Sequence, residues 1–408
     1  MSWSRGTGGM PDLRALRESL HSELYGRVVP FWLRHAIDPD GGINNCLADD
    51  GTLVSRDRWL WSQWRAVWVF SRLYRQTGDK QFIQIADGIR QFCCRHGWHA
   101  DGGWRLCVSA AGDEIRGRDS IYVDGFAMYG LAEFIAATDD EDAKRWARRT
   151  TSHVVDTLGV PHDQIPHFPY PVPRGMRVHG IPMIFSLCFQ TMADTMRDDG
   201  LAEIARRLSH EVMHSFYRQD RDVVLERINA DGTEAQRPLG TVVVPGHVIE
   251  SMWFQIDVAS ATGDTPTIDR AIALIRRHLE LGWDDPYGGL LLAVDADGGT
   301  EVGWSFADTK LWWPHTEAMI ALLRAYEISR APWCLDWYER IHSYTFKHFP
   351  DSSTGEWLQR LDRTGRPISE IVALPVKDPF HLPRALMLCI EILDRIEKDL
   401  SQTVGNIA

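Results

Sequence analysis

A glycine-containing turn recurs along the chain at nearly regular intervals, and this repeat limits the available folds more than any other feature. The copies begin with Asp38-Pro-Asp-Gly-Gly, Ala100-Asp-Gly-Gly, Asp222, Asp285-Pro-Tyr-Gly-Gly and Ser353-Thr-Gly. Measured from Gly41, the successive intervals are 61, 120, 66 and 67 residues. The second interval is nearly double the others, so we expect a degenerate sixth copy at 162–167. Each clear copy is predicted to form a short β-hairpin.

Two stretches of helical periodicity lie between successive turns, so the sequence predicts twelve helices. Their expected bounds are 11–36, 58–77, 80–97, 119–138, 140–157, 178–197, 200–218, 246–263, 265–281, 309–328, 331–348 and 380–398. Six helical hairpins that each bury a face on the next, and close on themselves, form an all-α (α/α)6 barrel. We expect the helix after each turn loop to belong to the inner ring, with the β-hairpin loops at one mouth.

The domain organisation follows from the same repeat. No segment between the helices has the composition of a linker, so we expect a single catalytic barrel at 11–400. The Ser/Gly-rich residues 1–10 are expected to be a disordered lead, and 401–408 a C-terminal tail.

Charge and cysteine usage exclude several classes of function. The net charge of -12 and the pI near 5.7 argue against nucleic acid or an anionic membrane as a partner, because both require a basic face. The seven cysteines are odd in number and lack CxxC spacing, so neither a disulfide framework nor a zinc site is expected. No run of 18 apolar residues occurs. We therefore expect a reduced, cytoplasmic protein.

Polar side chains gather near the starts of the predicted inner helices, which should all open on the same side. The residues at these positions are Arg58, Arg65, Tyr122, Asp124, Met183, His247, Glu250, Lys310, His315, Glu317, His381 and Arg384. Polar groups at inward positions of a helical core are costly unless they serve a site or pair with each other. The sequence therefore predicts a functional site at this mouth.

Two histidines in this set indicate proton transfer. His247 and Glu250 lie three residues apart on one helix face, where the carboxylate can orient the imidazole. His381 follows Lys377-Asp-Pro-Phe at a helix start, where neutral imidazole is favoured. Two opposed bases with a nearby cation are what reversible deprotonation beside a carbonyl requires, and Arg65 and Arg384 are candidates for the cation.

Other interpretations of these residues remain open. The His247–Glu250 pair is equally explained as a helix-stabilising contact. Glu250, Glu317 and Asp124 could supply the two inward carboxylates of a glycosidase. No HExxH, GxGxxG or P-loop pattern is present, so we expect no metal and no nucleotide cofactor. Most of the 17 tryptophans are expected to fill the core, although indoles also stack on sugar rings.

Several long motifs, in order along the chain, resemble the N-acylglucosamine 2-epimerase family. They are Arg58-Trp-Leu-Trp-Ser-Gln-Trp-Arg65, Pro245-Gly-His-Val-Ile-Glu-Ser-Met-Trp-Phe254, Lys310-Leu-Trp-Trp-Pro-His-Thr-Glu-Ala-Met-Ile320, Gly355-Glu-Trp-Leu-Gln-Arg-Leu-Asp-Arg-Thr-Gly365 and Phe380-His-Leu-Pro-Arg384. The resemblance covers roughly residues 20–398 and implies an (α/α)6 barrel that epimerises C2 of aldoses or interconverts aldoses and ketoses, without a redox cofactor.

The resemblance also implies roles for single residues. It makes His381 and His247 the acid/base pair and Arg65 a substrate-orienting cation. It makes Glu250 and Glu317 carboxylates that support the histidines and bind hydroxyls. The remaining candidates for substrate binding at this mouth are Arg58, Tyr122, Asp124, Met183, Trp253, Lys310, Trp313, His315 and Arg384.

The choice of sugar depends on short stretches. Gly180-Ile-Pro-Met-Ile184 lacks the Asn-x-x-Met-His of cellobiose 2-epimerases and mannose isomerases and is more similar to N-acetylglucosamine epimerases, as is His315. The stretch Val376-Lys-Asp-Pro-Phe-His381 is shorter than the form in animal enzymes. We expect interconversion of N-acetylglucosamine and N-acetylmannosamine, with a free-hexose epimerase or aldose-ketose isomerase as the alternative.

The resemblance bears on partners as well. Animal members are also named renin-binding protein, so a non-catalytic binding homologue is a further alternative, although the inward polar residues favour catalysis. The resemblance adds ATP as a candidate effector and a homodimer as the candidate assembly. No nucleotide motif supports the effector.

Overall fold

The computed structural model describes residues 12–405, with side chains to residue 402. The lead predicted at 1–10 lies outside the described residues. So do residues 406–408 of the predicted tail, whereas the last helix runs through residues 401–405. The described residues contain all twelve predicted helical segments.

The bounds of the helices follow the prediction closely. The first segment is α1 (Leu13–Glu23), a π-helical turn (Leu24–Val28) and α2 (Val29–His35). The others are α3 (Leu60–Thr77), α4 (Lys80–His96), α5 (Ile121–Thr138), α6 (Glu141–Thr157), α7 (Gly180–Met196), α8 (Asp199–His210) with a π-helical turn (Glu211–Phe216), α9 (Pro245–Ser260), α10 (Thr265–Gly282), α11 (Trp312–Ser329), α12 (Pro332–His348) and α13 (His381–Gly405).

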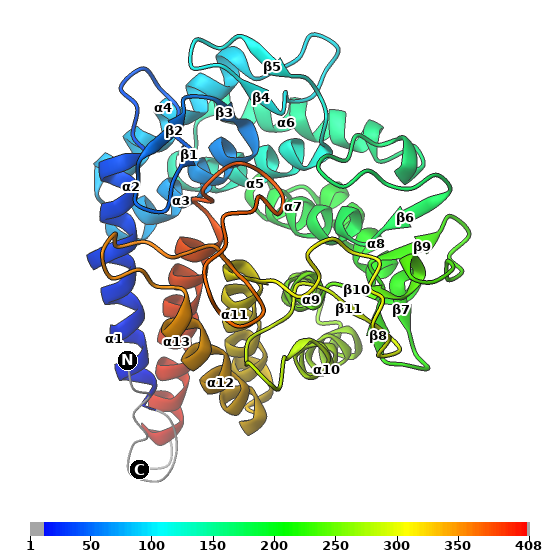
Figure 1. Cartoon of the computed structure of the whole chain (residues 1–408). Coiled ribbons are helices and arrows are strands. Elements are labelled where there is room, and N and C mark those ends of the chain that lie inside the picture. The colour runs from blue at the N-terminus through cyan, green and yellow to red at the C-terminus, as the bar shows by residue number, and fades with distance from the viewer. Residues whose placement is uncertain (1–11, 406–408) are drawn as a thin grey trace.

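These helices form the predicted (α/α)6 barrel (Figure 1). The inner helices α3, α5, α7, α9, α11 and α13 pack in sequence, and α4, α6, α8, α10 and α12 each cover the inner helix before them. The blue α1 covers the red α13, so the two ends of the described chain meet (Figure 1). Burial separates the rings: α5 is buried continuously from Ile121 to Ile135, whereas α6 buries only one face.

Local sequence explains the tight turns between the rings. Several inner helices end on a residue with left-handed backbone, such as Gly78 (φ 72°) and Asp139 (φ 57°). An aspartate follows directly and caps the outer helix: Asp79 accepts from the Gln81 N–H, and Asp140 from the Ala143 N–H. This pair of signals lets the chain reverse within two or three residues.

Only part of the hairpin prediction is correct. β1 (Cys46–Leu47) pairs with β2 (Leu53–Ser55), and β4 (Cys107–Val108) pairs with β5 (Glu114–Arg116), as expected. β7 (Tyr217–Arg218) and β8 (Val223–Val224) also pair within one loop. Elsewhere a strand pairs with a strand of another loop. These pairs are β6 (Met176–Val178) with β9 (Arg227–Asn229), β10 (Val242–Val243) with β11 (Val294–Asp295), and β12 (Lys310–Leu311) with β13 (Arg360–Leu361). In the described chain, 162–167 holds a 3-10 turn (His162–Gln164) and no hairpin.

The physical reason is that the segment entering each inner helix pairs with the loop of the next repeat. β3 (Arg58–Trp59) pairs with β4, and Ser120 bridges His167 in the position of the missing hairpin. The ring closes where the Lys377 N–H donates to the Asn45 carbonyl at 2.9 Å, which joins the last repeat to the first. This continuous rim holds the six inner-helix N-termini around one mouth.

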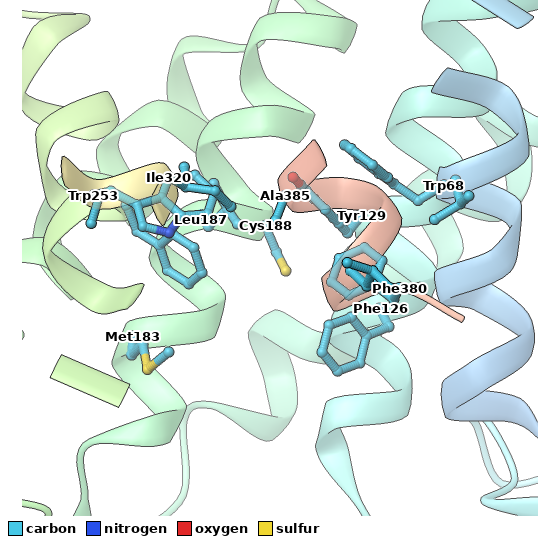
Figure 2. Close-up of a cluster of buried hydrophobic side chains, with 14 of the residues drawn as sticks. Trp68, Phe126, Tyr129, Met183, Leu187, Cys188, Trp253, Ile320, Phe380 and Ala385 are labelled. Carbon is cyan, nitrogen blue, oxygen red and sulfur yellow. The ribbon is translucent and has the colours of Figure 1, made fainter. Parts of the chain in front are cut away.

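An apolar cluster fills the barrel interior. Figure 2 shows Trp68, Tyr129, Leu187, Trp253, Ile320 and Phe380 pointing inward from the inner helices. Trp68 and Tyr129 are stacked with ring centroids 5.4 Å apart. Phe126 and Met183 belong to this cluster and also line the cavity described below, so the cluster forms part of its wall.

Candidate active site

A cavity of about 220 Å³ opens at the mouth of the inner ring. Each inner helix contributes to its wall from its first two turns. The contributing residues are Trp61 and Arg65 (α3), Tyr122 and Phe126 (α5), Met183 and Ile184 (α7), His247 and Glu250 (α9), Trp312 and Trp313 (α11) and His381 (α13). The site predicted at this mouth therefore exists as a cavity, and seven of the predicted residues line it.

His381 is held by a carboxylate on the neighbouring inner helix. Its Nδ1 lies 2.7 Å from Glu317 Oε1, and both side chains are buried. A carboxylate acceptor places the proton on Nδ1, so the lone pair of the neutral ring lies on Nε2. Nε2 lies 3.4 Å from Nη2 of Arg65, a group that can only donate. His381 is thus set to act as a base through Nε2.

Asp378 connects Arg65 to the start of α13. Its Oδ1 accepts from Arg65 Nη1 at 2.7 Å, and its Oδ2 accepts the backbone N–H groups of Phe380 and His381 at 3.1 and 2.8 Å. Burial opposes the charge on Asp378, but Arg65 and His381 outweigh it and lower its pKa. The Arg65 guanidinium also lies 4.0 Å from the centre of the Phe126 ring.

Arg384 lies beneath His381 between two carboxylates. Its Nη2 donates to Glu250 Oε1 and to Glu317 Oε1, both at 2.6 Å. Burial raises the pKa of Glu250, and the charge of Glu317 acts in the same direction. For Glu317 burial is outweighed by Arg384 and His381, so its pKa is lowered.

The same three groups have the spacing of a metal site. Ligand atoms of Glu250, Glu317 and His381 lie within 4.8 Å of one another. Arg384 Nη2, however, contacts both carboxylates and lies 3.5 Å from His381 Nδ1. A guanidinium therefore supplies the positive charge that a cation would bring, and the donor set does not fit a metal while Arg384 keeps this position.

His247 is held by Glu226, a residue that the sequence analysis missed. Its Nδ1 lies 3.1 Å from Glu226 Oε2, whereas the predicted partner Glu250 is bonded to Arg384. Burial lowers the pKa of His247, but Glu226 and then Glu250 outweigh it and raise the pKa above its ordinary value. Burial likewise opposes the charge on Glu226, yet His247 and His179 hold its pKa below the usual range.

The indole of Trp313 brings the two histidines together. Its ring centroid lies 5.2 Å from that of His247 and 5.7 Å from that of His381. The centroids of the two imidazole rings are therefore separated by no more than the sum of these two distances. Both line the same cavity, as the sequence required of an acid/base pair.

Two predicted substrate-binding cations do not line the cavity. Arg58 is buried, and its guanidinium donates to Asp38 Oδ2 at 2.5 Å and Asn44 Oδ1 at 2.7 Å. Lys310 is buried with its Nζ 3.0 Å from Asp284 Oδ2. Both face the rim loops, because the strand that enters an inner helix turns alternate side chains away from the cavity.

Asp124 and His315 bind the glycine-containing turns. Asp124 Oδ1 accepts the Trp104 N–H at 3.1 Å, and His315 Nε2 accepts the Leu290 N–H at 2.9 Å. Gln63 makes the same contact with Ile43 at 2.7 Å. Burial raises the pKa of Asp124 to about 7 and lowers that of His315 to about 3. Neither Asp124 nor His315 is among the residues that line the cavity, and both contact the loops instead, so substrate binding by them stays a prediction.

The remaining candidates fall into two groups. Tyr122 and Met183 line the cavity, and the Tyr122 hydroxyl lies 2.6 Å from His167 Nε2. Trp253, Glu317 and Arg384 lie one layer behind the cavity wall, where Trp253 Nε1 donates to Glu317 Oε2 at 3.1 Å. In this second group, Glu317 contacts His381 and Arg384 contacts Glu250.

Several lining residues were missed because they lie on rim loops without helical periodicity. They are His167, Tyr170, Glu226, Arg227, Trp304, Gln359, Arg360 and Asp378. Asp378 could have been predicted from the sequence as a helix N-cap, because an aspartate followed by proline is typical of that position. Glu226 had no such signal, because it lies in the rim loop between β8 and β9, outside any helical pattern, and only the tertiary fold brings it to His247.

The chain is similar to known proteins over most of its length. Residues 41–385 match the family model described as N-acylglucosamine 2-epimerase (GlcNAc 2-epimerase). The N-acylglucosamine 2-epimerase of Mus musculus is 30% identical over 406 residues, covering 93% of this chain and 92% of the relative. The cellobiose 2-epimerase of Bacteroides fragilis is 22% identical, covering 93% and 98%. The structure of the cellobiose 2-epimerase from Spirochaeta thermophila DSM 6192 has a TM-score of 0.81 at 21% identity, covering 96% of this chain and 100% of that chain.

Proposed function

Because the chain belongs to the N-acylglucosamine 2-epimerase family, we propose that it interconverts N-acetylglucosamine and N-acetylmannosamine by proton transfer at C2 of the ring-opened sugar. The chain is a sugar 2-epimerase and hence an isomerase. The observation that carries the proposed mechanism is the placement of His247 and His381 against one indole, each with Nδ1 on a buried carboxylate.

The proton transfer follows from that arrangement. With both Nδ1 atoms occupied by carboxylates, each imidazole presents Nε2 as its transferring atom. One Nε2 takes the C2 proton while the C–H electrons move toward the C1 carbonyl, giving an enolate with its charge on the C1 oxygen. The other imidazole, protonated, returns a proton to the opposite face of C2, and the carbonyl re-forms.

Arg65 is the proposed electrostatic partner of this intermediate. Its guanidinium is fixed by Asp378 and lies beside His381 Nε2, so it can donate to the oxygen on which charge develops. Glu317 and Arg384 act indirectly, by holding the His381 ring and by keeping Glu250 in place. The positive charge at Arg65 is present before reaction, so no reorganisation is needed when the proton leaves.

The acetamido group has an apolar surface available. Met183 and Ile184 line the cavity on α7, next to Phe126 and Trp61. This patch suits the acetyl methyl group better than a free hydroxyl, which would lose hydrogen bonds to water there. Free hexoses and cellobiose are the second candidates, favoured by the full-length similarity to cellobiose 2-epimerases.

A solvent-exchange experiment tests the proposal. Each sugar is incubated with the enzyme in deuterium oxide, and loss of the C2–H signal and appearance of the epimer are followed by NMR. We expect exchange and epimerisation with the acetamido pair, at a higher kcat/KM than with glucose, mannose or cellobiose. Exchange confined to free hexoses would move the substrate to the second class, and transfer of the proton to C1 would show as a ketose.

The proposed chemistry needs no cofactor, because two imidazoles and a guanidinium supply the proton transfer and the charge. ATP is proposed only as an effector. Its role would be seen as a change in kcat or in thermal stability on addition of ATP, without ATP consumption. If chelators and exhaustive dialysis abolish activity, the cofactor-free proposal is wrong.

We also propose a cytoplasmic location and a homodimer. None of the helices at 12–405 has the length and apolar character needed to cross a bilayer. All seven cysteines are unpaired and six are buried, in keeping with a reducing cytoplasm. The outer helices offer the surface for a homodimer, which light scattering on the purified chain would detect.

A further inference from the structure

The cavity wall carries more positively charged side chains than its carboxylates can pair with. Three carboxylates line the cavity, and each has a cationic partner: Glu226 has His247, Glu250 has Arg384 and Asp378 has Arg65. Two more arginines, Arg227 and Arg360, line the same cavity. Within the described part of the chain, neither of them makes an ion pair with a carboxylate.

Both guanidinium groups are held by contacts within the protein, but only one N–H donor of each makes a hydrogen bond within the described residues. Arg227 lies over the Trp304 indole, with its guanidinium carbon 4.8 Å from the ring centroid, and its Nη1 donates to the Gly303 carbonyl at 3.2 Å. Arg360 Nη1 donates to the Glu370 carbonyl at 3.0 Å. A guanidinium has five N–H donors, so each retains donors for a ligand. Burial lowers the pKa of Arg227, against the pull of Glu226, because no anion fully compensates its charge.

We propose that Arg227 and Arg360 form a subsite for an oxyanion carried by the sugar at the end of its carbon chain remote from C2. The chemistry is a phosphate ester or a carboxylate, both of which a planar guanidinium binds through paired hydrogen bonds. This inference rests on the proposed function, since it names a substituent of the same substrate.

The position of the two arginines fits the remote end of the sugar. The reacting carbon must lie near Trp313, between His247 and His381, which belong to inner helices. Arg227 and Arg360 instead belong to rim strands β9 and β13. An open-chain sugar whose C1 and C2 reach the inner helices would extend its other end toward this rim. A net charge of -12 gives no general attraction for anions, so a local positive subsite is required to hold one.

The test compares charged and neutral sugars on the same enzyme. C2–H exchange in deuterium oxide gives kcat/KM for N-acetylglucosamine, its 6-phosphate and its 6-carboxylate. Tryptophan fluorescence, which Trp304 and Trp313 should report, gives binding of each sugar without turnover. We expect one of the two anions to be preferred by about tenfold or more in both measurements, with the preference falling as salt is raised. The preferred anion identifies the source of the charge.

Matched variants assign the preference to these side chains. Arg227→Gln and Arg360→Gln should each lower the ratio of anionic to neutral kcat/KM by about tenfold. Arg118→Gln is the control, because Arg118 is also partly buried, donates to a carbonyl (Asp101, 3.2 Å) and lies outside the cavity lining; its ratio should not change.

The outcomes separate this inference from the function. Exchange of neutral sugars with no binding preference for either anion overturns the oxyanion subsite and leaves the epimerase proposal standing. Tight anion binding that both variants abolish, with no exchange of any sugar, supports the subsite and refutes the proposed substrate. An anion preference that survives both substitutions also refutes the subsite.

Discussion

His381 Nδ1 and Glu317 Oε1 lie 2.7 Å apart, and this contact joins the first turn of α13 to the second turn of α11. It fixes the ring plane of His381 and leaves Nε2 facing the cavity and Arg65. Glu226 holds His247 in the corresponding way from a rim loop. The two imidazoles are therefore oriented by different parts of the fold, and they can be tested separately.

Replacing one histidine at a time should separate exchange from epimerisation. His247→Ala and His381→Ala should each reduce epimerisation by about 10²–10⁴-fold, because one face of C2 loses its base. The remaining histidine should still exchange the C2 proton of one epimer, and the two variants should retain opposite epimers. NMR in deuterium oxide measures both. A variant that still epimerises at near-wild-type rate would contradict the two-base mechanism.

Glu226→Gln should move the pH dependence of the reaction. The pKa of His247 is raised by Glu226 against burial, so His247 keeps its proton above its ordinary titration range. In the direction in which His247 donates, activity falls as pH rises through that pKa. Without the carboxylate, burial dominates and the falling limb should move to lower pH by about 1 unit or more.

Glu211→Gln is a suitable control for this experiment. Glu211 pairs with Arg177, and neither residue lines the cavity. Its replacement should leave the kcat/KM profile where it was. An unmoved limb in Glu226→Gln would mean that another group titrates there.

Replacing Asp378 should lower both the unfolding free energy and kcat, and two variants distinguish these effects. Asp378→Ala removes the cap of α13 and leaves Arg65 without its carboxylate, which should cost about 3 kcal/mol of unfolding free energy. Asp378→Asn keeps an acceptor for the helix N–H groups, so it should lose less stability while kcat still falls. Urea unfolding and kcat measured on both variants test this. Equal stability loss in both would show that the cap contributes little.

His315→Ala tests whether this residue stabilises the fold or binds substrate. Loss of the bonds to Leu290 and Leu311 should reduce the unfolding free energy by about 2–4 kcal/mol at pH 8, with kcat of the folded fraction near wild type. The pKa of His315 is lowered to about 3 by burial, so its stabilising effect is complete above its ordinary pKa of about 6.5. That effect is lost progressively as pH falls from there toward 3. The difference between wild type and variant should therefore shrink between pH 8 and pH 5.

Ile184→Asn should weaken the preference for an acetamido sugar. Ile184 lines the cavity beside Met183, and a polar side chain there would oppose burial of the acetyl methyl group. We expect the ratio of kcat/KM for N-acetylglucosamine to that for glucose to fall about tenfold. Ile328→Asn, an exposed change on α11, is the control. An unchanged ratio would place the acetyl group elsewhere.

The fold could be predicted because its signals are local. Turn glycines, left-handed helix ends and capping aspartates such as Asp79 and Asp140 act within a few residues, so most helix bounds were within three residues of the structure. Strand partners could not be predicted, because β9 and β11 pair across repeats with β6 and β10. The single-domain organisation at 11–400 remains a prediction.

The sequence predicted the part of the site that depends on a residue's position in an inner helix. The first turn of each inner helix was correctly identified, and His381, His247 and Arg65 line the cavity. Position on the helix did not show which way a side chain turns, so the contacts of Asp124 and His315 with the glycine turns could not be predicted. Glu226 comes from a rim loop, and only the tertiary structure brings it to His247.

The hydrogen bond from Lys377 to Asn45 gives the barrel a seam, and the reacting groups lie on both sides of it. Arg65 lies on the first inner helix and His381 on the last. The two side chains therefore stay in contact only while the first and last repeats remain joined. A barrel that opens between its first and last repeats would keep its helices and its circular dichroism spectrum, but it would lose catalytic activity.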